Sequence, residues 1–270
     1  MDEAPLRIMM DQGVNYQYEY YIKPGLCLND KAITKLSLEI QNIAFSCFST
    51  LPGYQCMTGA REDLNDKIIL LARDQTGKAV AFQSLAILEI PRVGEVLHIG
   101  LLCVEPQARR SGIAHQLLYR GLFTYIFRYK HRSSIWITNV SSIFSVLATL
   151  SYHCKQLYPS VRLDTPTKKH RRIAEHFSTH SRKLVCIPDS IEFDKEKFIF
   201  KEGNRNSVFY NGSKNENATY SRDDIHNEYY KNIINSTDGD AVLQVGHLSA
   251  WDSITQCGNF VSKKIKKSIV

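Results

Sequence analysis

The chain has 270 residues, of which 43% are hydrophobic and 23% charged, so it can bury a sizeable core and is not a disordered chain. Its formal net charge of +7 fits an anionic ligand, a nucleic acid or a membrane surface and selects none of them. The seven cysteines include no Cys-x-x-Cys pair, which disfavours a zinc site or a disulfide framework and favours reduced thiols. Because neither a signal peptide nor a long apolar run is evident, we predict a cytoplasmic protein with no membrane partner.

The first part of the chain combines one helix with a run of strands. Residues 1–28 are aromatic and irregular, and Asn29 or Asp30 can cap a helix beginning at Lys31, where apolar residues recur at helical spacing. Short turns then separate three apolar segments. These segments predict an antiparallel meander, over residues 67–73, 79–90 and 95–104.

The next part has an α/β pattern. A helix is predicted from Ser111 to about Arg128, a fourth strand over residues 134–140 and a second helix over 141–154. Strand–helix–strand units joined to an antiparallel half predict a mixed α/β (α+β) fold, with a central sheet and flanking helices.

The character of the chain changes after residue 158. Basic residues are concentrated over 162–183, where KKHRR (168–172) predicts a solvated helix face rather than a nucleic-acid site. Beyond them lie a polar stretch, a helix near 223–234, a strand over 241–248 and a loose tail. We predict that residues 1–160 form the core. Residues 161–270 are expected to complete the sheet and add an elaboration, without forming an independent domain.

The segment most informative about ligand binding is residues 98–118, HIGLLCVEPQARRSGIAHQLL. An apolar strand ends at Val104, and a short loop leads into a helix. Unsatisfied N–H groups and the helix dipole make such a junction an anion site. Gly112 allows close approach of a phosphate, and Arg109 and Arg110 can add charge-assisted bonds. The segment therefore predicts a phosphate-bearing ligand, although it is neither a P-loop nor a dinucleotide fingerprint.

This segment resembles a known family. Val104-Glu105-Pro106 followed by Arg109-Arg110-Ser111-Gly112-Ile113-Ala114 is similar to the central motif of the GNAT superfamily of N-acetyltransferases, Arg/Gln-x-x-Gly-x-Gly/Ala after a strand ending in Val-x-Pro. The resemblance extends over roughly residues 67–158. It implies the GNAT fold with splayed central strands, acetyl-coenzyme A (acetyl-CoA) as the acyl donor, and no metal.

The same resemblance implies a set of cofactor-binding residues. Backbone amides from Arg109 to Ala114 would hold the pyrophosphate, and the strand end from Leu102 to Val104 would pair with the pantetheine arm. The family's usual bulge in this strand would lie at Gly100. The full set is Leu102, Cys103, Val104, Arg109, Arg110, Ser111, Gly112, Ile113, Ala114 and, at the end of the fourth strand, Asn139, which could bind the cofactor or the acceptor.

Two catalytic residues are also implied. His98 stands where many members have a glutamate, and it could deprotonate the acceptor amine directly or through water, because its pKa is expected near neutral pH. Glu95 is the nearest acidic substitute. The family's Asn-x-x-Ala-x-x-x-Tyr is matched by Ser145-x-x-Ala148-x-x-x-Tyr152, so Tyr152 would protonate the departing thiolate. The alternative is that His98 is a polar residue on a strand face and that Tyr152 packs on the core.

The implied reaction is direct transfer of an acetyl group from acetyl-CoA to an amine in a ternary complex. The acceptor would be a small molecule, a protein lysine or a protein N-terminus, and a homodimer is possible. No nucleic acid is expected. Because the family's glutamate and asparagine are both replaced, a non-catalytic GNAT-like protein that binds an acyl-CoA or regulates another protein stays open as an alternative.

Overall fold

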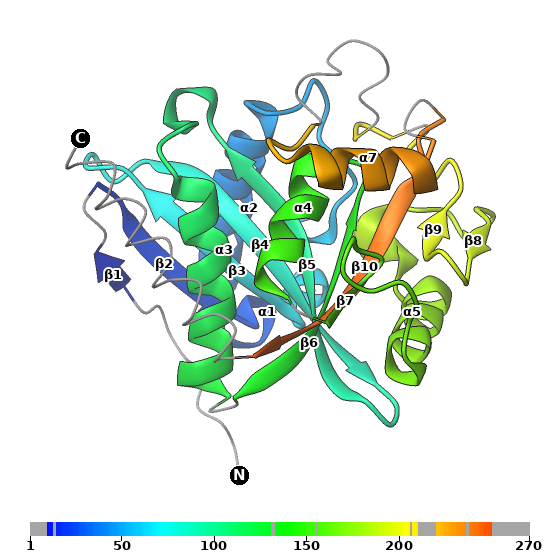
Figure 1. Cartoon of the computed structure of the whole chain (residues 1–270). Coiled ribbons are helices and arrows are strands. Elements are labelled where there is room, and N and C mark those ends of the chain that lie inside the picture. The colour runs from blue at the N-terminus through cyan, green and yellow to red at the C-terminus, as the bar shows by residue number, and fades with distance from the viewer. Residues whose placement is uncertain are drawn as a thin grey trace.

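The computed structural model describes residues 10–12, 15–130, 133–154, 156–205, 207–209, 220–235 and 238–249. Its centre is one mixed sheet with the strand order β1-β2-β3-β4-β5-β6-β10-β9-β8 (Figure 1). Neighbouring strands on this path are antiparallel except β5 and β6, which are parallel. The strands are β1 (Met10–Gln12), β2 (Gln17–Ile22), β3 (Lys67–Arg73), β4 (Ala79–Ile90), β5 (Gly94–Val104), β6 (Ser134–Ser141), β8 (Phe193–Asp194), β9 (Ile199–Phe200) and β10 (Ala241–Ser249), with β7 (Gln156–Tyr158) pairing with β10.

Helices cover both faces of this sheet, and α3 and α4 lie in front of it in Figure 1. Alternate residues of β3 show the two layers, because Ile68 and Leu70 pack in the cluster under α3 while Ile69 and Leu71 pack in the cluster under α2. The helices on the α3 side are α3 (Ile113–Phe123), α4 (Phe144–His153) and α7 (Asp224–Ile233), and those on the other side are α2 (Asp30–Phe45) and α5 (Lys168–His180). Shorter turns are α1 (Pro24–Cys27), the 3-10 helices η1 (Gln55–Met57), η2 (Glu62–Leu64), η3 (Pro106–Ala108) and η5 (Arg182–Val185), and the π-helix η4 (Thr124–Tyr129).

The mixed α/β architecture with an antiparallel first half is confirmed, and so are most of its elements. The side chain of Asn29 caps α2 by accepting a hydrogen bond from the backbone N–H of Ala32 at 2.9 Å. The predicted apolar stripe of this helix faces the sheet. The helix predicted from Ser111 is α-helical only from Ile113 and continues as the π-helix η4, so its bounds differ by a few residues.

The prediction that residues 1–28 are irregular is wrong for Gln17–Ile22. This segment is β2, which pairs with β3 along its whole length. Tyr18 and Tyr20 are buried on one face. The alternate positions hold Glu19 and Tyr21 on the α2 side of the sheet, where Glu19 is buried and paired with Arg73 at 2.8 Å. Because buried or bulky residues lie on both faces, the sequence lacks the alternation of apolar and polar residues by which a strand is predicted.

The C-terminal part of the chain enters the sheet. Strand β10 lies between β6 and β9, and it pairs with β6 from Val242–Ser141 to Ser249–Ser134. The predicted helix and strand near residues 223–248 are confirmed as α7 and β10. In KKHRR of α5 the lysines and arginines are exposed, while His170 is buried. The predicted tail lies outside the described residues, and the domain assignment stays a prediction. None of the helices in the described ranges is long and apolar enough to cross a membrane.

Candidate functional site

The central strands β5 and β6 are joined over a short length only. Their parallel pairing runs from Val96–Trp136 to Ile99–Asn139 and then stops, although β5 continues to Val104. Beyond Ile99, the side of β5 that faces β6 therefore has no strand partner in the described structure, while its other side remains paired with β4 as far as Val104. An unpaired strand edge inside a sheet offers backbone N–H and C=O groups to an extended ligand.

A bulge in β5 lies where the splay begins. Gln83 pairs with Leu102 and Leu85 with Ile99, so that Ser84 of β4 stands opposite two residues of β5. The Ser84 hydroxyl accepts a hydrogen bond from the Leu101 N–H at 2.9 Å and lies 3.2 Å from the Leu101 carbonyl oxygen. A Cβ on Gly100 would lie 2.8 Å from Ser84 Oγ, so only glycine fits without a shift. This is the bulge position predicted at Gly100.

The loop after β5 presents an open helix N-terminus. Arg110 and Gly112 both adopt the left-handed conformation, with φ of 65° and 83°. This geometry turns the chain sharply into α3, where the N-cap Gly112 has no side chain and the Ile113 N–H makes a long hydrogen bond of 3.4 Å to Ser111 Oγ. The N–H groups of its first turn have no intrahelical partner, as at any helix start. Arg109 and Arg110 are exposed beside them. These residues fit a phosphate group.

Val104 connects this loop to the end of α2. Its carbonyl oxygen accepts a hydrogen bond from Arg109 Nε at 3.1 Å and lies 3.4 Å from Cys47 Sγ. A hydrogen bond from Cys103, together with smaller effects of Ser46 and Arg109, lowers the pKa of Cys47 to about 5. The Cys103 thiol is buried and its pKa is raised by that pairing with Cys47. The predicted cofactor-binding residue Cys103 thus has its side chain turned into the α2 layer, and only its backbone lies on the splayed strand.

His98 is enclosed by the protein. It has 1% of its surface exposed, its Nδ1 lies 3.1 Å from Thr138 Oγ1, and its ring packs against Phe177 of α5 with centroids 4.9 Å apart. Burial, followed by the positive charge of Lys67, lowers the pKa of His98 to about 3. The prediction that this histidine titrates near neutral pH is therefore wrong, and the imidazole is neutral at physiological pH.

The two ring nitrogens of His98 differ in their hydrogen bonding. His98 Nε2 is buried and has no hydrogen-bond partner among the described residues. The ring borders a narrow pocket on the α2 and α5 side of the sheet, which Lys67, Cys56 and Ser84 also line. The alternative base Glu95 lies at the start of β5, buried and paired with Lys130 at 3.1 Å.

The other predicted site residues, Tyr152 and Asn139, are hydrogen-bonded to C-terminal elements. Tyr152 is 38% exposed and its hydroxyl donates a hydrogen bond to Asp223 Oδ2, at the start of α7, at 2.7 Å. Its pKa is raised by partial burial and by that carboxylate. Asn139, at the apex of the splay, is 3% exposed and its Nδ2 lies 3.4 Å from Gln244 Oε1 of β10. The structure does not bring Tyr152 and His98 together in one pocket.

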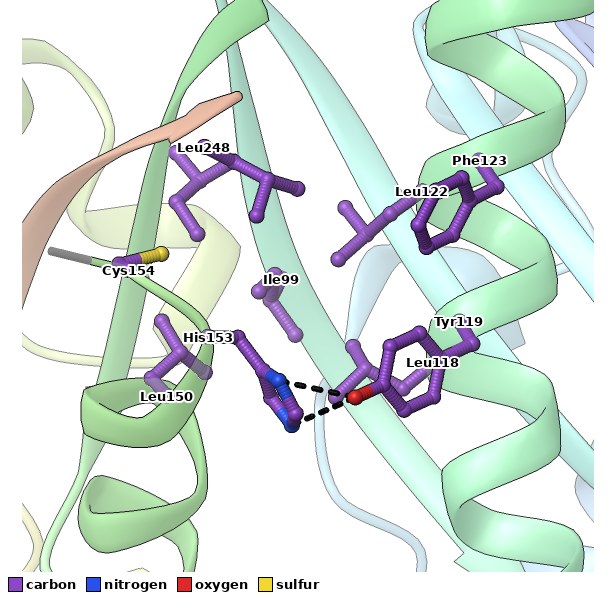
Figure 2. Close-up of a pocket in the computed structure, with 10 residues that line it drawn as sticks. Ile99, Leu118, Tyr119, Leu122, Phe123, Leu150, His153, Cys154 and Leu248 are labelled. Atoms are coloured by element: carbon purple, nitrogen blue, oxygen red, sulfur yellow. Dashed lines mark hydrogen bonds between the residues drawn. The ribbon is translucent and has the colours of Figure 1, made fainter. Parts of the chain in front are cut away.

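A second pocket lies between α3 and α4, and the sequence analysis missed it. Figure 2 shows Tyr119 of α3 facing His153 of α4, with Ile99 between the two helices. The Tyr119 hydroxyl lies 2.8 Å from His153 Nδ1. Because adjacent helix residues point in different directions, α4 turns His153 and not Tyr152 toward α3. The signal in the sequence was the His153 neighbouring the matched tyrosine.

Comparison with known proteins gives likenesses in structure alone. No protein-family model matches the chain, and no curated protein matches its sequence. Solved structures similar to it include nourseothricin acetyltransferase (21% identity over 28% of this chain and 41% of that chain, TM-score 0.22), a GNAT family N-acetyltransferase from Escherichia coli in complex with CoA (13%, 56% and 70%, TM-score 0.27) and a ribosomal-protein-alanine N-acetyltransferase from Brucella melitensis (19%, 44% and 75%, TM-score 0.31). The chain spans 55% and 41% of the length of the first two structures matched. These partial overlaps carry no argument about activity, so the proposals below rest on the site itself.

Proposed function

We propose that this chain is an acyltransferase that moves an acetyl group from acetyl-CoA to an amine in a ternary complex. One observation carries the proposal: the unpaired edge of β5 leads directly into a helix N-terminus that has glycine at its cap and two exposed arginines beside it. A strand edge and an anion site in continuity suit a ligand that has an amide-containing arm and a phosphate end.

The residues fit that ligand in two parts. Backbone N–H groups from Arg109 to Ala114, together with the Arg110 guanidinium, would hold the pyrophosphate. The edge from Leu102 to Val104 would pair with the pantetheine amides. When bound, acetyl-CoA supplies an acyl group activated as a thioester. Backbone N–H groups on the free edge of β5 would then stabilise negative charge on the acyl oxygen.

The acceptor amine would approach from the pocket that His98 borders. In the tautomer whose Nδ1–H donates to Thr138 Oγ1, His98 Nε2 can accept a hydrogen bond from the amine or from a water molecule. A group with a pKa of about 3 is a weak base, so we assign His98 to orienting the amine, with proximity of the two substrates supplying much of the rate. The acceptor classes that fit this reaction are small amines, protein lysines and protein N-termini.

A second function is favoured by a specific observation. The two groups expected to move protons are occupied or sealed, because Tyr152 is bonded to Asp223 and His98 is buried with a depressed pKa. A GNAT-like protein that binds an acyl-CoA without turnover would have these features. It shares the donor site with the enzyme and differs from it in releasing no thiol.

Calorimetric titration with acetyl-CoA tests the donor site. We expect the wild type to bind, and Arg110→Glu and Gly112→Asp each to weaken binding at least tenfold, because each places a carboxylate against the phosphates. The turn between β4 and β5 offers matched controls. Arg92 is likewise exposed with φ of 65°, and Gly94 has φ of 89° and open space around it.

The controls Arg92→Glu and Gly94→Asp should bind like the wild type, since they introduce the same charges away from the loop. Loss of binding in all four variants would point to net charge rather than to this site, and no binding by the wild type would remove both functions. A thiol-release assay across amine classes then separates them: release identifies the enzyme, and binding without release in every class identifies the non-catalytic protein.

A further inference from the structure

The pocket between α3 and α4 is apolar and lies beside the point where β5 and β6 part. Ile99 is the last residue of β5 that pairs with β6, and its side chain belongs to the floor of this pocket together with Ile137. Gly100, the next residue, begins the edge to which the thioester end of the donor is assigned under the proposed function. The pocket therefore begins one residue from the expected position of the acyl carbon.

The walls come from three elements and are almost wholly apolar. Leu118 and Leu122 are one turn apart on α3, Leu150 lies on α4, and Leu248 lies on β10 (Figure 2). Several of these side chains stay partly exposed, among them Leu118 and Phe123. Partly exposed apolar side chains that line a hollow lose contact with water when an apolar group enters it, which stabilises the complex.

The polar groups at the rim are paired with each other. Tyr119 and His153 lie across the pocket from one another and are hydrogen-bonded at 2.8 Å. No aspartate, glutamate, lysine or arginine lines the pocket in the part of the chain that the structure describes. An acceptor amine, which is cationic in water, would find no carboxylate here, whereas a hydrocarbon chain would find matching surface.

We propose that this pocket binds the end of an acyl chain about one or two carbons longer than acetyl, so that the preferred donor is propionyl- or butyryl-CoA rather than acetyl-CoA. This inference rests on the proposed function, because it takes the thioester to lie at the bulge of β5. It adds the acyl-chain class of the donor, which the anion site and the strand edge do not determine.

Titration calorimetry with free CoA and with acetyl-, propionyl-, butyryl- and hexanoyl-CoA tests it. Each methylene that becomes buried should tighten binding about fourfold, so that butyryl-CoA binds about fifteenfold more tightly than acetyl-CoA. The gain should end at the chain length that fills the pocket. Leu118 is the position to vary, because its side chain lines the pocket and its partial exposure leaves room for change.

Leu118→Trp should keep the affinity for free CoA and abolish the gain with chain length, while Leu118→Ala should move the best chain to a longer one. Leu38→Trp on α2, 52% exposed on the other side of the sheet, is the matched control and should behave like the wild type. Equal affinity of the wild type for free CoA and for all four acyl-CoAs would overturn the acyl pocket and leave the donor site standing. No binding of free CoA or any acyl-CoA would overturn both.

Discussion

At the scale of single residues, tertiary contacts lower the pKa of both His98 and Cys47, for opposite reasons. The neutral form of His98 is favoured because its ring is shut away from water, whereas the charged form of Cys47 is favoured because donors surround its sulfur. At pH 7 the histidine is therefore uncharged, and the cysteine gives up its proton more readily than an ordinary thiol. Each shift has a consequence that can be measured without knowing the acceptor.

For His98, we predict a pH-dependent loss of stability that His98→Gln removes. Between its ordinary pKa of 6.5 and its folded pKa of about 3, the unfolded chain binds a proton at this site and the folded chain does not. As the pH falls through that window, the wild type should lose about 1.4 kcal/mol of unfolding free energy per pH unit relative to the variant. Urea unfolding at pH 7.5, 6.5, 5.5 and 4.5 measures the difference.

The control for this series is His180→Gln, which changes an exposed histidine on α5. Its stability should follow the wild type at every pH. If the unfolding free energies of the wild type and His98→Gln changed in parallel with pH, His98 would be able to bind a proton within the fold. His98 would then again be a candidate general base.

For Cys47, we predict alkylation that hardly depends on pH. The thiolate is the reactive form, and with a pKa of about 5 the half-buried Cys47 is already ionised at pH 6.5. Its rate with iodoacetamide, followed by peptide mass spectrometry, should stay level from pH 6.5 to 8. Cys27, whose pKa is raised by burial, should react faster as the pH rises. A Cys47 rate that climbs in step with that of Cys27 would contradict the assignment.

The strand–loop–helix geometry around Gly112 was predictable because it is local, and the binding roles of its residues stay a prediction. Gly112 and Arg110 follow a strand end and precede a helix, and the sequence shows that order directly. The pKa of His98 was not predictable, since the side chains that bury it come from α5 and β6, far along the chain. The orientation of Tyr152 was equally hidden, because it depends on how α4 is rotated against α3 and α7.

At the scale of elements, the bulge of β5 fixes where the two central strands part. We predict that Gly100→Ala lowers the free energy of unfolding by about 1–3 kcal/mol, because the new Cβ would lie 2.8 Å from Ser84 Oγ and 3.1 Å from its carbonyl oxygen. Gly53→Ala, at a loop position with nothing within 4 Å, should be neutral or slightly stabilising. Chemical denaturation of both variants provides the measurement. Equal stabilities would mean that β4 and β5 adjust freely, and the bulge would not be a fixed feature.

Elements whose pattern is local and regular were predicted, and those defined by their neighbours were not. Helix α2 has a cap at Asn29 and an apolar stripe, so its own sequence is sufficient to predict it. Strand β2 becomes recognisable only beside β3, where Arg73 neutralises Glu19 and allows both faces of the strand to be covered. The pocket between α3 and α4 depends in the same way on two helices meeting across Ile99.

At the scale of the whole molecule, the connection between the two parts of the chain runs through β10. This strand covers the free side of β6 over its whole length, and its Gln244, fully buried, donates to the Tyr230 hydroxyl at 2.7 Å and to the Leu147 carbonyl oxygen at 3.2 Å. One side chain thus joins the sheet to α7 and α4. Removing β10 would expose the edge of β6 and leave those buried polar groups without a partner.

We therefore predict that a fragment of residues 1–160 does not fold alone. Without β10, the eight-residue ladder from Ser134 to Ser141 becomes an exposed, largely apolar edge, which favours aggregation over a folded monomer. The fragment of residues 161–270 keeps β9 and β10 but lacks β4 and β5, which complete the core under α5, and α4, against which α7 packs, so it should also be insoluble by itself. Co-expression of the two fragments should recover a soluble complex that elutes as a one-to-one pair in size-exclusion chromatography. A soluble, monomeric 1–160 fragment with a cooperative unfolding transition would show that the C-terminal part is an addition to a core that is already complete, and the shared sheet would then have little role in stability.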